Sequence, residues 1–188
     1  LRAPSFAGFS PNPFDETLLT AKVDWVVNNR SSAFFRYSFN DNELVGPFPP
    51  GSGIVPRSST SGIFQSNDQI VKNRANNLVG GWNFSINPNV SNNVVVNFSK
   101  FRNSIDAATV GIPEIRLNPE QDWRSGTNAL TPQVTPQTRV QIREDLTWLK
   151  GDHTFNFGGN WERTAIGGLF QFASPVRIRL FSTDAAGN

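Results

Sequence analysis

The chain has 188 residues, about the length of one domain, and 37% of them are hydrophobic while 12% are aromatic. Its 17 basic and 15 acidic residues are scattered without a basic stripe, which argues against a nucleic-acid partner. The lack of cysteine excludes disulfides and cysteine-ligated zinc, and no apolar run reaches the length of a transmembrane helix. Many aromatics at low bulk hydrophobicity predict an all-β sheet that is apolar on one face and polar on the other.

The first predicted element is a hairpin over about 18–41 that turns at Asn29-Arg30-Ser31. Apolar and polar residues alternate along both of its strands, which is the pattern of a half-buried sheet. The predicted apolar face carries Leu19, Ala21, Val23, Trp25 and Val27, then Ala33, Phe35, Tyr37 and Phe39. The stretch that follows, about 42–74, is rich in Pro, Gly and Ser, and we expect a long loop there.

A second hairpin is predicted over about 75–102, with a turn at Asn87-Pro88-Asn89. Its apolar face holds Leu78, Trp82, Phe84 and Ile86, then Val90, Val94, Val96 and Phe98. A second long loop is expected over about 104–135.

The third hairpin, about 136–165, has the clearest alternation, and Gly151-Asp152 suits a type II′ turn. Pairing Lys150 with His153 puts Gln141 opposite Glu162. Arg139 and Arg143 then lie diagonal to that carboxylate on the polar face, whereas Glu144 falls on the apolar face, near a bulge or the headgroups. A third long loop is expected over about 166–188.

Three tight turns therefore lie on one side of the predicted sheet and three long loops on the other. Outer-membrane β-barrels have short periplasmic turns and long extracellular loops. The predicted strands of roughly 10–14 residues are long enough to span a bilayer, for which a tilted strand needs about 9–11. We therefore expect an antiparallel up-and-down meander of about six long strands that forms a partial slice of a large transmembrane β-barrel.

Six strands are too few for a closed barrel, because single-chain barrels begin at about eight. The chain starts at Leu1, contains no Met and stops at Asn188 within a polar stretch. From these features we expect an internal fragment of a longer precursor.

Two stretches carry a family resemblance. The segment 22–25, Lys-Val-Asp-Trp, with 33–41, Ala-Phe-Phe-Arg-Tyr-Ser-Phe-Asn-Asp, resembles an early barrel hairpin of TonB-dependent outer-membrane receptors. The segment 151–162, Gly-Asp-His-Thr-Phe-Asn-Phe-Gly-Gly-Asn-Trp-Glu, resembles a turn-and-strand motif of the Oar-like receptors, which carry a carboxypeptidase-regulatory-like domain.

The resemblance implies a 22-stranded barrel in the Gram-negative outer membrane that binds an extracellular ligand and transports it. The implied partners are outer-membrane lipid, the receptor's own plug domain, the TonB–ExbB–ExbD system and an unidentified extracellular ligand. It supplies no catalytic residues and no cofactor, so we expect the chain not to be an enzyme.

The same interpretation assigns roles to two sets of side chains. Polar residues expected to face the lumen are Lys22, Asp24, Arg36, Arg139, Arg143 and Glu162. Residues expected to form a lipid-facing aromatic girdle are Trp25, Trp82, Trp148, Phe155, Phe157 and Trp161.

Other chemistry is weakly indicated. His153 is the single histidine and stands beside a tight turn, so neither a zinc site nor a Ser-His-Asp triad is expected. The segment Asn40-Asp41-Asn42-Glu43 offers oxygen ligands for a cation but lacks EF-hand spacing.

Two other function classes remain open from the sequence. A soluble β-sandwich adhesion or glycan-binding module would bury the Phe, Trp and Val side chains between two layers. An outer-membrane enzyme such as a barrel lipase or protease would need a nucleophile–base pair, and none stands out.

Overall fold

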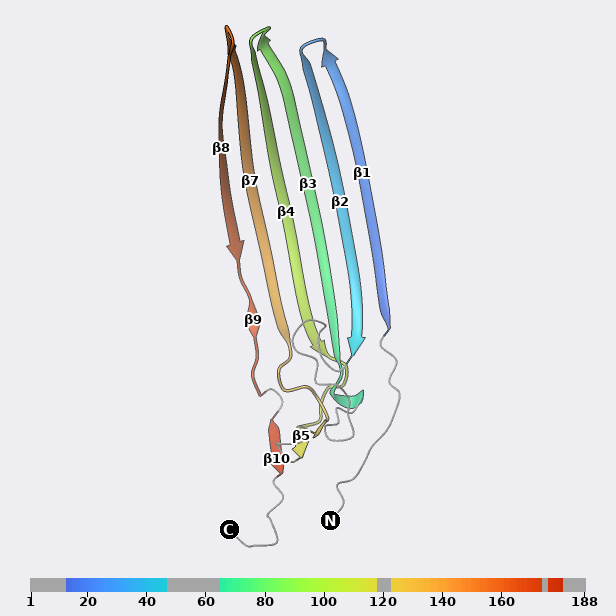
Figure 1. The fold of residues 1–188 in the computed structure, drawn as a ribbon. Helices are drawn as coiled ribbons and strands as arrows, with labels where there is room; N and C mark the ends of the chain where they lie inside the picture. The colour runs from blue at the N-terminus through green and yellow to red at the C-terminus, as the bar shows by residue number, and fades with distance from the viewer. Residues whose placement is uncertain (1–12, 47–64, 118–122, 174–175, 181–188) are drawn as a thin grey trace.

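The structure is a computed structural model that describes residues 13–46, 65–117, 123–173 and 176–180. Its main body is a sheet of six long antiparallel strands in the order β1-β2-β3-β4-β7-β8 (Figure 1). The strands are β1 Phe14–Asn28, β2 Ser31–Gly46, β3 Gln69–Asn87, β4 Val90–Ala107, β7 Gln133–Lys150 and β8 His153–Ile166. The predicted all-β antiparallel meander is confirmed.

The three tight turns lie together at one end of the sheet, and β5 (Glu114–Leu117) and β10 (Arg177–Leu180) lie at the other (Figure 1). Asn28 Oδ1 accepts a hydrogen bond from the Arg30 amide at 2.8 Å, which closes the first turn. Asn87 Oδ1 does the same for the Asn89 amide at 2.9 Å. Gly151 has a φ of +58°, as the first central position of a type II′ turn requires.

The strands run further toward the loop end than the alternation predicts. β2 extends to Gly46 and β3 begins at Gln69, so the expected loop boundaries at 42 and 74 are wrong. β4 likewise extends to Ala107 and β7 begins at Gln133. The extra residues mix polar and apolar side chains on both faces, since Leu44 pairs with Val71 on one face and Val45 with Ile70 on the other. This removes the period-two signal while leaving the backbone ladder intact. The Pro- and Ser-rich tracts expected to be loops, 47–51 and 58–62, lie outside the described residues.

All three of the expected long loops contain short elements that the sequence did not predict. A second, three-stranded sheet has the order β10-β5-β6, and β10 pairs with β5 in parallel. Its strands are β5 Glu114–Leu117, β6 Trp123–Ser125 and β10 Arg177–Leu180, while β9 Leu169–Phe170 extends the edge beside β7 and η1 Gln65–Asn67 is a 3-10 turn. We call this assembly at the loop end the cap.

The main sheet is a single layer. Among the described residues only Val71, Val79 and Ala129 are buried hydrophobic side chains. Large apolar side chains remain exposed, with Val23 at 64% and Trp161 at 54%. No second layer of described residues covers them, so the expectation of a soluble β-sandwich is not met. No helix in the described part of the chain is long and apolar enough to cross a membrane.

Candidate functional site

The register assigns every strand residue to one of two faces, because directly paired residues in an antiparallel sheet project to the same side. One cross-strand row runs Val23–Phe35–Gly80–Val96–Ile142–Trp161. The neighbouring row on the other side runs Lys22–Arg36–Val79–Asn97–Gln141–Glu162. We call the side of the first row the apolar face and the side of the second the polar face.

All six residues expected to face the lumen lie on the polar face. The third hairpin has the anticipated register, with Lys150 opposite His153 and Gln141 opposite Glu162. Arg139 lies 3.8 Å from the Glu162 carboxylate, as its diagonal position predicted. Arg143 is also diagonal to Glu162 as expected, and its guanidinium forms an ion pair with Asp145 on its own strand at 2.8 Å.

Amide side chains link the strands across the polar face. Asn77 Nδ2 donates to Asn97 Oδ1 at 2.8 Å, and Gln141 Nε2 donates to Asn160 Oδ1 at 3.0 Å. Near the loop end one relay crosses four strands, each amide donating to the next oxygen in the order Asn103, Asn73, Asn42, Asn40 and Glu16. These side-chain hydrogen bonds help to fix the strand register on the polar face, where apolar packing is sparse.

This geometry rejects the cation site considered at Asn40-Asp41-Asn42-Glu43. The two asparagines belong to the polar-face relay, whereas the two carboxylates project from the apolar face. The carboxylates already have partners, because Arg74 binds Asp41 through two hydrogen bonds and Lys72 lies 3.0 Å from Glu43. No group of three or more metal-binding side chains occurs within the described ranges.

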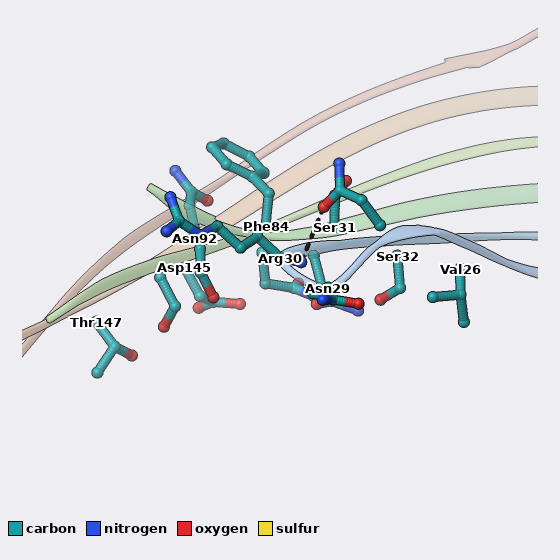
Figure 2. Close-up of a pocket in the computed structure, with 14 residues that line it drawn as sticks. Val26, Asn29, Arg30, Ser31, Ser32, Phe84, Asn92, Asp145 and Thr147 are labelled. Atoms are coloured by element: carbon teal, nitrogen blue, oxygen red, sulfur yellow. Dashed lines mark hydrogen bonds between the residues drawn. The ribbon is translucent and has the colours of Figure 1, made fainter. Parts of the chain in front are cut away.

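A concavity of about 560 Å³ hollows the polar face near the tight turns. Figure 2 shows Asp145, Thr147, Ser32 and Val26 on one side of the ribbon and Phe84 on the other. The lining is mostly Asn, Ser and Thr, with Asp145 as its carboxylate. Such a surface offers many hydrogen-bond donors and acceptors but no nucleophile–base pair.

One large aromatic side chain on the polar face, Phe34, lies directly over a glycine of the neighbouring strand. The Phe34 ring covers Gly81, where an added Cβ would lie 2.0 Å from Phe34 Cε1. Lys22 Nζ lies 5.5 Å from the centre of the same ring. The glycine therefore provides the space that this ring occupies.

The six predicted girdle residues all lie on the apolar face. Trp25 and Trp82 both pair with Ala33, in a row close to the tight turns. The Trp82 indole donates to Ser31 Oγ at 2.6 Å. Trp161 pairs with Ile142, one row from the Tyr37 row at the loop end of the apolar zone.

The apolar zone, which we call the belt, has a polar border at each end. Toward the loops, the Tyr37 hydroxyl donates to Asn76 Oδ1 at 2.8 Å. Along β4 the belt covers Val90 to Phe98, nine residues, which at about 3.3 Å per residue is roughly 30 Å of strand. A strand of this length, tilted, spans a bilayer core.

Glu144 is the charged exception within the belt, and the structure explains it. Asn92 Nδ2 donates to Glu144 Oε1 at 2.7 Å on the same face. The residue pairs with Val94, in the row that contains Trp82. Its carboxylate therefore has a hydrogen-bond donor beside it on the apolar face, in the central row of the belt along β4.

Beyond the belt, toward the loops, the apolar face becomes charged. Asp41 pairs with Arg74 in the register, and Arg74 in turn pairs with Arg102. The hydrogen bond from Arg74 lowers the pKa of the Asp41 carboxyl, and the hydrogen bond to Glu43 raises the pKa of Lys72. This band lies outside the belt, on its loop side.

The cap is organised around a buried carboxylate. Glu114 is fully buried and forms an ion pair with Arg177, whose side chain is 10% exposed. Asn67 Nδ2 and the Ala129 amide donate to Glu114 Oε2 at 3.2 and 2.9 Å. Asn128 Oδ1 accepts a hydrogen bond from the Leu130 amide at 2.9 Å, and Asn128 Nδ2 donates to the Asn67 carbonyl oxygen at 3.4 Å. One carboxylate thus ties together the two long connections and the C-terminal segment.

Sequence reasoning missed the cap and the polar relay. Glu114 and Arg177 are 63 positions apart and belong to no motif, so nothing in the sequence marks them as partners. His153 pairs with Lys150 beside the third turn, and its ring lies 6.2 Å from that of Phe155.

The comparisons with known proteins match this two-faced sheet. The family model described as outer membrane beta barrel domain matches residues 3–176. The chain belongs to this family. Neither the curated proteins nor the solved structures contain a match. The chain is therefore an outer-membrane β-barrel protein, and the outer membrane is where it is located.

Membership in the outer-membrane barrel family explains the exposed belt. In such barrels an apolar band flanked by aromatic girdles faces lipid, and the interior is polar. A barrel wall needs no second layer, because the bilayer covers its outer face. In this barrel wall, Trp148 lies in the row of Val90 at the turn end of the belt, and Tyr37 at the loop end has the amphipathic character of an interfacial aromatic.

Proposed function

We propose that the chain is part of the barrel wall of a TonB-dependent receptor, which binds an extracellular ligand and transports it across the outer membrane. The observation that carries the proposal is the combination of a bilayer-length apolar belt with a continuous polar face behind it. The two segments that resemble Oar-like receptors lie in this wall, in β1 and β2 and in β8.

The two outer strands support a larger barrel. β1 and β8 end the strand order of the long sheet, and all their residues are exposed. An unpaired strand edge in lipid leaves backbone groups without partners, at a cost of several kcal/mol each. Further strands must therefore pair with these edges in the membrane.

The polar face would line the lumen in this proposal. The concavity near the turns, about 560 Å³ and rich in amides and hydroxyls, would contact the receptor's plug domain. The cap, at the opposite end, would meet the ligand as it arrives. The energy would come from TonB–ExbB–ExbD, and the chain would neither catalyse a reaction nor need a cofactor.

The first test is the complete coding sequence together with a cross-linking experiment in the natural full-length protein. We expect a plug domain upstream of the barrel. Because this chain has no cysteine, Asn93→Cys in the concavity provides a single thiol within it. A thiol-to-amine cross-linker should join it to the plug, while Val96→Cys on the apolar face should not react. The absence of a plug, or equal cross-linking from both positions, would overturn the proposal.

The second test measures energy coupling. If the plug covers the concavity and TonB displaces it, a water-soluble maleimide should label Asn93→Cys faster when ligand-replete cells are energised. Deleting TonB should abolish this rise. A labelling rate that is indifferent to both energy and TonB indicates a passive barrel and contradicts the transport mechanism.

A further inference from the structure

A groove of about 310 Å³ lies between β3, β4 and β7 at the loop end of the sheet. Six of its lining residues belong to the apolar face: Arg74, Asn76, Lys100, Arg102, Pro136 and Thr138. The register places Arg74, Arg102 and Pro136 in one row, with Asn76, Lys100 and Thr138 in the next toward the belt. The groove therefore directly borders the belt.

The positive charge in this groove is only partly neutralised. Arg74 is held by Asp41 on β2. Lys100 and Arg102, both exposed, make no hydrogen bond or ion pair with any residue that the structure describes. Cross-strand neighbours of like charge, such as Arg74 and Arg102, destabilise a sheet. An anion bound between them would remove that repulsion.

The position of the groove along the strands, relative to the belt, indicates the kind of anion. Lys100 and Arg102 follow Phe98 on the same face by two and four residues, or roughly 7 and 13 Å along the strand. The Tyr37–Asn76 hydrogen bond marks the border of the belt at the same level. Since long loops are extracellular in this class, the cations stand at the headgroups of the outer leaflet.

We propose that this groove binds a phosphate group of an anionic glycolipid in the outer leaflet of the membrane. Arg102 donates its guanidinium fork to the phosphate oxygens, and Lys100 supplies a second cation. Asn76 Nδ2 and the Thr138 hydroxyl, which have no partner among the described residues, face the same groove and suit sugar hydroxyls.

A lipid satisfies the site better than a free anion does. Phe98, Leu78 and Val96 continue directly from the groove into the belt on the same face. Acyl chains attached to the phosphorylated sugar would lie along these side chains, whereas inorganic phosphate would use only the cations. This inference depends on the outer-membrane placement of the chain and not on transport, so the two proposals can fail separately.

The test uses the natural full-length protein, purified from its outer membrane in mild detergent. Binding of bisphosphorylated lipid A is titrated by native mass spectrometry. At about 1 kcal/mol per basic residue, the double variant Lys100→Gln with Arg102→Gln should bind roughly 30-fold more weakly. The matched control is Lys150→Gln, which removes an apolar-face cation at the turn end and should change binding less than twofold.

A second arm distinguishes the sources of phosphate. Dephosphorylated lipid A should lose the same affinity that the double variant loses, and 10 mM inorganic phosphate should not displace the intact lipid. Far-UV circular dichroism and heat-modifiable migration establish that the variants are folded. Unchanged lipid A affinity in the folded double variant would overturn the inference, as would displacement by inorganic phosphate or an equal loss in Lys150→Gln.

Discussion

Replacing each of the two adjacent glycines of β3 by alanine tests the interlock between Phe34 and Gly81. An added Cβ at Gly81 would lie 2.0 Å from the ring, whereas at Gly80 the nearest atom is 4.0 Å away. Both substitutions reduce the entropy of the unfolded chain to the same degree, which favours the folded state by roughly 0.5–1 kcal/mol. Only Gly81→Ala must also displace a ring, and overpacking of this kind costs about 1–3 kcal/mol.

The difference between the two variants therefore isolates the steric term. We expect Gly80→Ala to be neutral or slightly stabilising and Gly81→Ala to be less stable than it by about 1–3 kcal/mol. The free energy of unfolding is measured for the full-length protein in lipid vesicles by denaturant titration with tryptophan fluorescence. Adding Phe34→Ala should remove most of the penalty at Gly81 and change Gly80→Ala additively. Equal stability of the two alanine variants, or additivity of Phe34→Ala with Gly81→Ala, would refute the interlock.

Three further predictions concern the two faces, the cap and a turn. A thiol at Asn97 should react with a water-soluble maleimide at least tenfold faster than one at Val96 in native membranes, since the two project from opposite faces; equal rates would contradict the assignment. Arg177→Met should leave the buried Glu114 carboxylate unpaired and lower the stability of the cap by about 3–5 kcal/mol, seen as faster amide hydrogen exchange there. Gly151→Ala should lower the free energy of unfolding by about 1–2 kcal/mol because its φ is +58°. No neighbour crowds the added Cβ, so this cost comes from the backbone alone; Gly159→Ala, also with no neighbour within 4 Å, serves as its control.

The hairpins were predictable because local chemistry determines them. A two-residue Gly151-Asp152 turn permits one register, and that register places Gln141 opposite Glu162. In the belt, the alternation of apolar and polar residues, with exceptions such as Glu144, indicates which side meets lipid. The two sets of residues expected on opposite faces are accordingly found on opposite faces.

The strand ends were not predictable from alternation. Around Asp41 and Asn42, polar side chains occupy both faces, because neither face there touches lipid tails. The strand persists through contacts between strands, such as Asp41 with Arg74 and Asn42 with Asn73. A pattern within one segment cannot reveal partners that lie more than 30 positions away.

The cap was hidden for a related reason. Glu114 has the sequence context of an ordinary surface residue, and only folding brings Asn67 and Arg177 to it. Its short strands are three or four residues long, too short for periodicity to appear.

Sharing one carboxylate has a mechanical consequence for the outer end of the barrel. Asn67, Ala129 and Arg177 come from three separate stretches of chain, yet each donates to an oxygen of the one Glu114 carboxylate. If any one of these stretches moved away alone, the buried Glu114 carboxylate would lose one of its partners. We therefore expect these three stretches of the cap to move together as one unit, not independently.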